Sequence, residues 1–183
     1  MPKRGRAGAI KFEQSVDDLC LPFLFDLPRE SLIMVDASSM DSISLLENTL
    51  AIAEIVGIDT ETEPRVRPTM PLQKTSLLQL SIRTKKSEEK VFIIDLINLF
   101  KDSDIRNRVD AALCECWRNQ TIIKVAHALR GDALEICDSY PDTSAFRSIK
   151  SVLEVSALHR LMNPHREHDV SLKFLTRTYL HGE

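Results

Sequence analysis

Residues 55–61 of the chain read Ile-Val-Gly-Ile-Asp-Thr-Glu, a compact apolar run that ends on two acids. The apolar run predicts a buried strand, and alternation along a strand places Asp59 and Glu61 on the same face. Two ionised carboxylates side by side repel each other, and a shared cation is the simplest way to hold both. Oxygen ligands of this kind suit Mg²⁺ or Mn²⁺. A strand end that simply carries acids is the competing interpretation of this pair.

The segments that follow predict a sheet around this strand. Strands are expected at residues 76–82 and 91–95, and the charged connection at 83–90 is short enough for a hairpin. The first three strands therefore form an antiparallel meander. Helical and strand patterns then alternate, at residues 105–116, 122–126, 132–140 and 151–155. These elements predict an α/β fold of the ribonuclease-H-like kind, with a mixed five-stranded sheet and helices on both faces.

The domain itself is expected to occupy residues 30–183, with an appendage at residues 1–29. A short strand at 32–35 precedes the helical pattern that leads into the central strand. The appendage begins with basic residues and ends in a proline-containing apolar stretch, and the prolines argue against a helix there. Its basic start is either a nuclear-import or nucleic-acid-binding arm or a solvated tail.

A third acid, Asp132, follows the predicted strand at 122–126, in the stretch His127-Ala-Leu-Arg-Gly-Asp132. Ligand sites in α/β folds collect at strand ends. A strand adjacent to the first one would bring this acid within reach of Asp59 and Glu61. The dipole of a helix also favours an acid in its first turn without any ligand. The residues alone leave both interpretations open.

The order of these blocks resembles a known family. Residues 55–61, then Lys74-Thr-Ser-Leu-Leu-Gln79-Leu-Ser, then Val91-Phe-Ile-Ile-Asp95 look like the opening of a DEDD-type 3′–5′ exonuclease domain. The closest kind is the RNase D group, which includes the Werner-type exonucleases. Residues 124–132 are similar to the second motif of that family, and residues 171–180 resemble the helix that precedes its third motif.

This resemblance implies hydrolysis of phosphodiester bonds in RNA or single-stranded DNA from the 3′ end, by two Mg²⁺ or Mn²⁺ ions. It implies that Asp59 bridges the ions, Glu61 holds the ion on the nucleophile side and Asp132 the ion on the leaving-group side. Five further residues are expected to contact the nucleic acid: Thr60, Gln79, Lys124, His127 and Arg130. Solvated surface cations are the alternative interpretation of Lys124 and Arg130.

The sequence departs from the family pattern near its C-terminus. The third motif of the family supplies a fourth carboxylate after the helix predicted at 171–181, and the sequence stops at Glu183. The stretch His165-Arg-Glu-His-Asp169 is one residue too short for the His-type motif and precedes that helix. We expect a C-terminally truncated domain; degeneration, or completion by another chain, are the alternatives. A catalytically inactive nucleic-acid-binding or protein-adaptor domain with the same fold is therefore the alternative function.

Composition narrows the remaining choices. The net charge is −3, so binding of a polyanion must rely on a local basic patch or on metal ions. No apolar stretch approaches the ~20 residues that a membrane span needs, and no membrane partner is expected. The four cysteines lack the spacing of a zinc site. Reduced thiols are expected, in an intracellular protein of the nucleus or cytoplasm.

Overall fold

The strand that ends on the two acids is β2 (Ala53–Thr62), in the middle of the sheet. The computed structural model describes residues 28–63, 74–165 and 170–180. In it β2 pairs antiparallel with β3 (Thr75–Thr84), which pairs antiparallel with β4 (Glu89–Asp95). On its other side β2 pairs parallel with β5 (Ile123–Ala126), which pairs parallel with β6 (Val152–Glu154). The predicted meander and the mixed sheet are confirmed.

Among the described residues the sheet has six strands rather than the predicted five. The additional strand is β1 (Leu32–Val35), which pairs parallel with β4 at the edge and completes the order β1-β4-β3-β2-β5-β6. This strand was expected as an element, but four residues of sequence do not indicate a pairing partner. Burial explains its place in the sheet, because Val35 is fully buried in the core.

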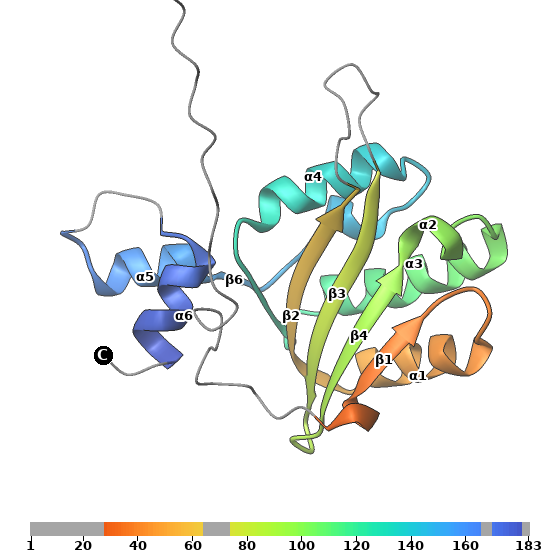
Figure 1. Cartoon of the computed structure of the whole chain (residues 1–183), viewed down its shortest axis with the longest axis horizontal. Coiled ribbons are helices and arrows are strands. Elements are labelled where there is room, and N and C mark those ends of the chain that lie inside the picture. The colour runs from red at the N-terminus through yellow and green to blue at the C-terminus, as the bar shows by residue number, and fades with distance from the viewer. Residues whose placement is uncertain (1–27, 64–73, 166–169, 181–183) are drawn as a thin grey trace, which may run out of the picture.

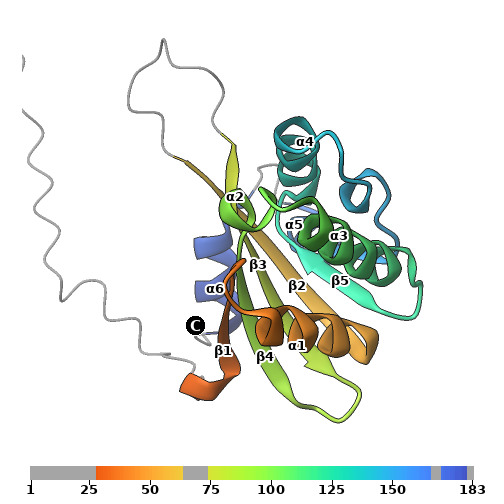
Figure 2. The ribbon, with the colours of Figure 1, turned by 90° about the vertical axis from the view of Figure 1, so that its right-hand side faces the viewer.

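Helices cover both faces of the sheet, as predicted. In Figure 2, α1 (Met40–Ala51) and α3 (Ser103–Arg118) lie side by side along one face, and α6 (Leu172–Leu180) lies beyond the other. Figure 1 shows α5 (Val155–Met162) beside α6. The remaining helical elements are the short α2 (Leu96–Leu99), α4 (Leu129–Ser139) and the 3₁₀ turns η2 (Arg29–Ser31) and η3 (Ala145–Arg147).

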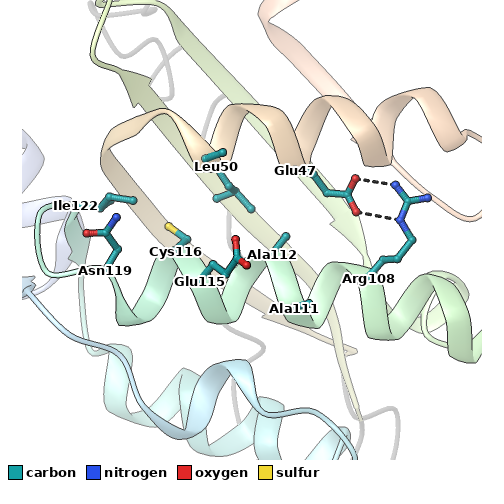
Figure 3. Close-up of a pocket in the computed structure, with 10 residues that line it drawn as sticks. Glu47, Leu50, Arg108, Ala111, Ala112, Glu115, Cys116, Asn119 and Ile122 are labelled. Atoms are coloured by element: carbon teal, nitrogen blue, oxygen red, sulfur yellow. Dashed lines mark hydrogen bonds and ion pairs between the residues drawn. The ribbon is translucent and has the colours of Figure 1, made fainter.

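The main core lies between the sheet and the pair α1 and α3. Alternate residues of β2, Val56 and Ile58, point into it and pack with Trp117 and Leu113 of α3. An ion pair ties the two helices together, since Arg108 donates two hydrogen bonds of 3.0 and 2.6 Å to Glu47 (Figure 3). These contacts also form one wall of a cavity of about 420 Å³ between α1 and α3.

The face of the sheet opposite the main core carries the acids of β2. Gly57 and Asp59 of β2 point there, because they alternate with the core residues Val56 and Ile58. A second cavity, of about 280 Å³, lies on this face. Its lining includes Gly57, Asp59, Gln79, Val125, His127 and Leu172. The two acids of β2 therefore lie at the end of a strand whose other face builds the core.

Other predictions concern the cysteines and the termini. Cys114 and Cys116 are buried, and no disulfide joins them or Cys137 in the part of the chain that the structure describes. Cys20, residues 1–27 of the predicted appendage at residues 1–29, residues 166–169 and the end of the chain from residue 181 lie outside the described residues. None of the helices in the described ranges is long and apolar enough to cross a membrane.

Candidate active site

The candidate site begins where β2 extends beyond the end of its neighbour β5. The last pair between the two strands is Ile58 with Ala126, so Asp59 and Glu61 lie beyond that ladder. On the other side Asp59 is opposite Gln79 of β3, and Glu61 is opposite Leu77. Both acids are exposed and share one face of the strand, as the sequence predicts. This leaves one edge of β2 accessible at the position of the acids.

Helix α4 brings Asp132 to this edge. Burial raises the pKa of the Asp132 carboxyl above its ordinary value, and the negative charge of Asp59 raises it further, followed by the charge of Glu135. A carboxyl whose pKa responds to a neighbouring charge lies close to it. The structure thus brings Asp132 and Asp59 together, although they are far apart in the sequence.

Two threonines of β2 lie against α4. The Thr60 hydroxyl favours the ionised Asp132 carboxylate and lowers its pKa, against the effect of the acids. One helical turn further on, the Thr62 hydroxyl donates to Glu135 over 2.8 Å. Thr60 was predicted to contact nucleic acid. In this structure its hydroxyl affects the pKa of Asp132, and its contact with nucleic acid stays a prediction.

The first turn of α4 is held by Glu154, a residue that sequence reasoning missed. Helix α4 starts after Ala128, which has the left-handed values φ 60° and ψ 29° and provides no side-chain cap. The Glu154 carboxylate instead accepts the amides of Ala128 (3.0 Å) and Leu129 (3.3 Å) and the hydroxyl of Ser156 (3.1 Å). Burial raises the pKa of Glu154, but these hydrogen bonds outweigh it and the pKa lies below its ordinary value.

A signal for Glu154 was present in the sequence. Like Asp59, it is an acid that directly ends an apolar strand segment. Its partners are amides that begin a different helix, so their identity depends on the position of β6 beside β5. The charge of Glu154 also raises the pKa of Asp132. Glu154 therefore belongs to the same acidic neighbourhood as Asp59 and Asp132.

Three of the predicted nucleic-acid contacts lie around the acids. Gln79 and His127 line the 280 Å³ cavity together with Asp59. His127 Nε2 lies 2.9 Å from the Val170 carbonyl oxygen, so it joins the end of β5 to the segment that enters α6. Arg130 is exposed in the first turn of α4.

The prediction for Lys124 is wrong. Its side chain is fully buried on the core side of β5, opposite Val56 of β2. The ammonium group donates to the carbonyl oxygens of Asn119 (2.6 Å) and Ile122 (3.0 Å), at the end of α3. Burial lowers its pKa. Lys124 faces away from Asp59 and cannot reach a phosphate there, because alternation along β5 places it on the other face of the sheet.

The side-chain chemistry of the acids suits a divalent cation, but their carboxylates do not converge on a common position in this structure. Their donors are hard carboxylate oxygens of the kind that Mg²⁺ and Mn²⁺ bind. Asp59 and Asp132 repel each other across the end of β2. Within residues 28–63, 74–165 and 170–180, however, no three His, Cys, Asp or Glu side chains are gathered closely enough to hold a metal ion. Asp59 and Asp132 are therefore the two acids placed to share a cation, and Glu61 lies two residues further along β2.

Comparisons with known proteins identify the family and the fold of the chain. The family model described as 3′–5′ exonuclease matches residues 36–183. The fold is similar to the EXO domain of Aedes aegypti Nibbler, with a TM-score of 0.63 and 19% identity, covering 83% of this chain and 69% of that one. It is also similar to Trypanosoma brucei RNase D in complex with GMP (TM-score 0.62, 13% identity, 80% and 40% covered). Escherichia coli RNase D gives a TM-score of 0.54 at 18% identity, with 81% and 33% covered.

At these identities the solved structures show the fold alone, and the ribonuclease-H-like prediction is confirmed. No curated protein sequence matches the chain. The chain spans about 40% of the length of Trypanosoma brucei RNase D and 69% of the Nibbler domain structure. The family model, by contrast, covers the site and most of the chain, from Asp36 onward. The chain therefore belongs to the 3′–5′ exonuclease family.

Proposed function

We propose that the chain hydrolyses phosphodiester bonds of RNA or single-stranded DNA from the 3′ end, with its reaction centre at Asp59, Glu61 and Asp132. The observation that carries the proposal is the pairing of Asp59 with Asp132 at the free edge of β2, in a chain of the 3′–5′ exonuclease family. Two repelling carboxylates, one at the end of β2 and one in the first turn of α4, are costly for the fold unless a cation neutralises them.

We further propose that these three acids hold two Mg²⁺ or Mn²⁺ ions. Such ions would supply an activated water and neutralise the charge that develops on the scissile phosphate. The protein contributes the placement of the acids. Glu154 fixes the first turn of α4 and with it Asp132. Glu61 completes the set from β2, on the same face as Asp59.

The other groups around the acids suit a nucleic-acid chain end. Gln79 and His127 line the cavity beside Asp59 and offer polar groups to a sugar or phosphate. Arg130 offers a cation in the exposed first turn of α4. The amides of Ala128 and Leu129 are already occupied by Glu154, so the start of α4 does not bind a phosphate through them.

RNA is the substrate to test first. A structure of Trypanosoma brucei RNase D, which has a similar fold, was solved in complex with RNA. Cys114 and Cys116 are unpaired thiols in the described part of the chain, which supports an intracellular location, nuclear or cytoplasmic.

The test is a time course with 5′-labelled RNA and DNA oligonucleotides in Mg²⁺ or Mn²⁺. The variants are Asp59→Asn and Asp132→Asn, and the matched control is Asp138→Asn, an exposed acid on the same helix α4. A ladder that shortens from the 3′ end with the wild-type chain and Asp138→Asn, and not with the other two, supports the proposal. Near-normal shortening by Asp59→Asn or Asp132→Asn overturns the assignment of these acids.

A second candidate is an inactive domain that binds nucleic acid or protein. It is favoured by the finding that, among the described residues, no three acids converge on one point. It predicts that the oligonucleotide is bound and stays full length in either metal. The same time course, combined with a binding measurement by fluorescence anisotropy, separates the two functions.

A further inference from the structure

A groove between α5 and α6 adjoins the cavity beside Asp59, with which it shares Val155 and Leu172. It has a volume of about 330 Å³ and is almost entirely apolar. Each helix contributes four positions at the spacing of one helical face. The lining residues are Val155, Leu158, His159 and Met162 from α5, and Leu172, Leu175, Thr176 and Tyr179 from α6.

The floor of the groove is well packed. His159 is 2% exposed, and its Nδ1 lies 2.8 Å from the Tyr179 hydroxyl. Asn163 donates to the same hydroxyl over 3.1 Å. The His159 ring also meets the Phe174 ring edge-on at 5.6 Å. These contacts fix α5 against α6, so the groove is a formed feature of the fold.

Large apolar side chains are left exposed along the groove and its rim. Leu161 is 80% exposed, Met162 53% and Leu172 50%. Several large apolar side chains exposed beside one groove are typical of an interaction site in soluble proteins. Two helices that each present an apolar stripe to one groove can accept a third helix, which would insert side chains at i, i+3 and i+7.

The charges around the groove restrict the partner. Steps of about 100° per residue place Lys173 and Arg177 on the outer side of α6, next to Thr176. On the α5 side the rim is apolar, with Leu158 and Leu161. In the described parts of α5 and α6 every charged side chain is basic. Glu154, just before α5, is engaged with the first amides of α4.

A nucleic-acid strand fits this groove poorly. Single strands are held by stacking on exposed aromatic rings, and the groove offers aliphatic side chains and one exposed aromatic, Tyr179. We propose that the groove between α5 and α6 binds an amphipathic helix of a protein partner, with an apolar stripe on its inner face and acidic residues on the flank that faces Lys173 and Arg177.

The test uses a synthetic fluorescent helix of about five turns, about 18 residues, with leucines at i, i+3 and i+7 and glutamates on one flank. A second peptide carries lysines in place of the glutamates. The protein variants are Leu158→Gln and the double variant Lys173→Glu with Arg177→Glu. The matched control is Leu45→Gln on α1, since Leu45 and Leu158 are 38% and 37% exposed.

We expect the acidic peptide to bind and the basic peptide to bind at least about threefold more weakly. Leu158→Gln should weaken the acidic peptide about tenfold, as loss of an apolar anchor does, and Leu45→Gln should leave it unchanged. The double charge reversal should weaken the acidic peptide and strengthen the basic one. Circular dichroism of each variant checks that the helices are retained.

Several outcomes overturn the proposal. Equal binding of the two peptides, absence of binding, or equal losses in Leu158→Gln and Leu45→Gln would each show that the groove does not select an acidic helix. Displacement of the bound peptide by a single-stranded oligonucleotide would make the groove a nucleic-acid surface. Self-association in sedimentation that Leu158→Gln abolishes would make the occupant a second copy of this chain.

Discussion

Removing the Glu154 carboxylate should destabilise the fold because it holds the first turn of α4. In Glu154→Ala the amides of Ala128 and Leu129 lose their acceptor, and the Ser156 hydroxyl loses a partner. Loss of a helix cap costs about 0.5–2 kcal/mol, and a hydrogen bond to a charged group contributes about 1.5–3 kcal/mol. The hydrogen bond from the Leu129 amide is long, at 3.3 Å, and the two hydrogen bonds to the Glu154 carboxylate are partly accessible to water. We therefore expect about 2 kcal/mol for Glu154→Ala.

Glu154→Gln keeps one carbonyl acceptor and removes the charge, so about 1 kcal/mol is expected. Loss of the charge also relieves the repulsion of Asp132, which offsets part of this cost. Urea unfolding at about pH 7 measures both values, and with a slope of 2–3 kcal/mol per M the Ala variant should shift the midpoint by about 0.8 M. Glu115→Gln, an exposed acid on α3, is the control and should leave the midpoint unchanged.

The pH dependence gives a second measurement of the same contact. The folded-state pKa of Glu154 lies below its ordinary value of 4.5. Its stabilising contribution is therefore present above pH 4.5 and is lost as the pH falls through the folded pKa. The difference between wild type and Glu154→Gln should shrink between about pH 5 and about pH 3. A midpoint that does not move, or a difference that is the same at both pH values, refutes the capping role.

Other predictions concern the remaining charged groups. Lys124→Ala should cost about 2–4 kcal/mol in urea unfolding, because it empties a buried site and leaves two carbonyl oxygens without their donor; a soluble, folded variant that only weakens oligonucleotide binding would restore the phosphate role. Asp132→Asn should raise the free energy of unfolding slightly at neutral pH without divalent ions, because the raised pKa of Asp132 means that its charged form is disfavoured in the fold and solvent screens part of that effect. Thermal unfolding measures this, and a destabilised variant would contradict it. Mg²⁺ in excess should raise the Tm of the wild-type chain and leave Asp59→Asn unchanged, and equal shifts would place the ion elsewhere.

The sequence predicted the parts of the fold that depend on local patterns. The apolar run before Asp59 and the short connection between the next two strands indicate β2, β3 and β4, because burial and hairpin length are local properties. The pairing of β1 with β4 is a contact between distant segments. Four residues that would fit any edge of a sheet do not encode it.

The same distinction explains the errors and omissions at the site. Lys124 lies in the right strand and near the right motif, but its direction depends on the register of β5 against β2. The pairing of Val56 with Lys124 puts the lysine in the core, and a shift of one residue would have put it opposite Gly57, on the face of the sheet that Asp59 shares. Glu154 was missed because its partners are backbone amides, which carry no residue-specific signal in a sequence.

The placement of Asp132 is an argument for a function that the fold alone does not need. Burial and the charge of Asp59 both disfavour its ionised form, and Glu135 and Glu154 add to the repulsion. The dipole of α4 favours an acid in its first turn, while the favourable effect of the Thr60 hydroxyl would be served equally by the carbonyl oxygen of an asparagine, without the charge. Local choices that oppose the stability of the fold are expected at functional sites. The Asp59 and Asp132 pair is such a choice, and a bound cation would turn its repulsion into attraction.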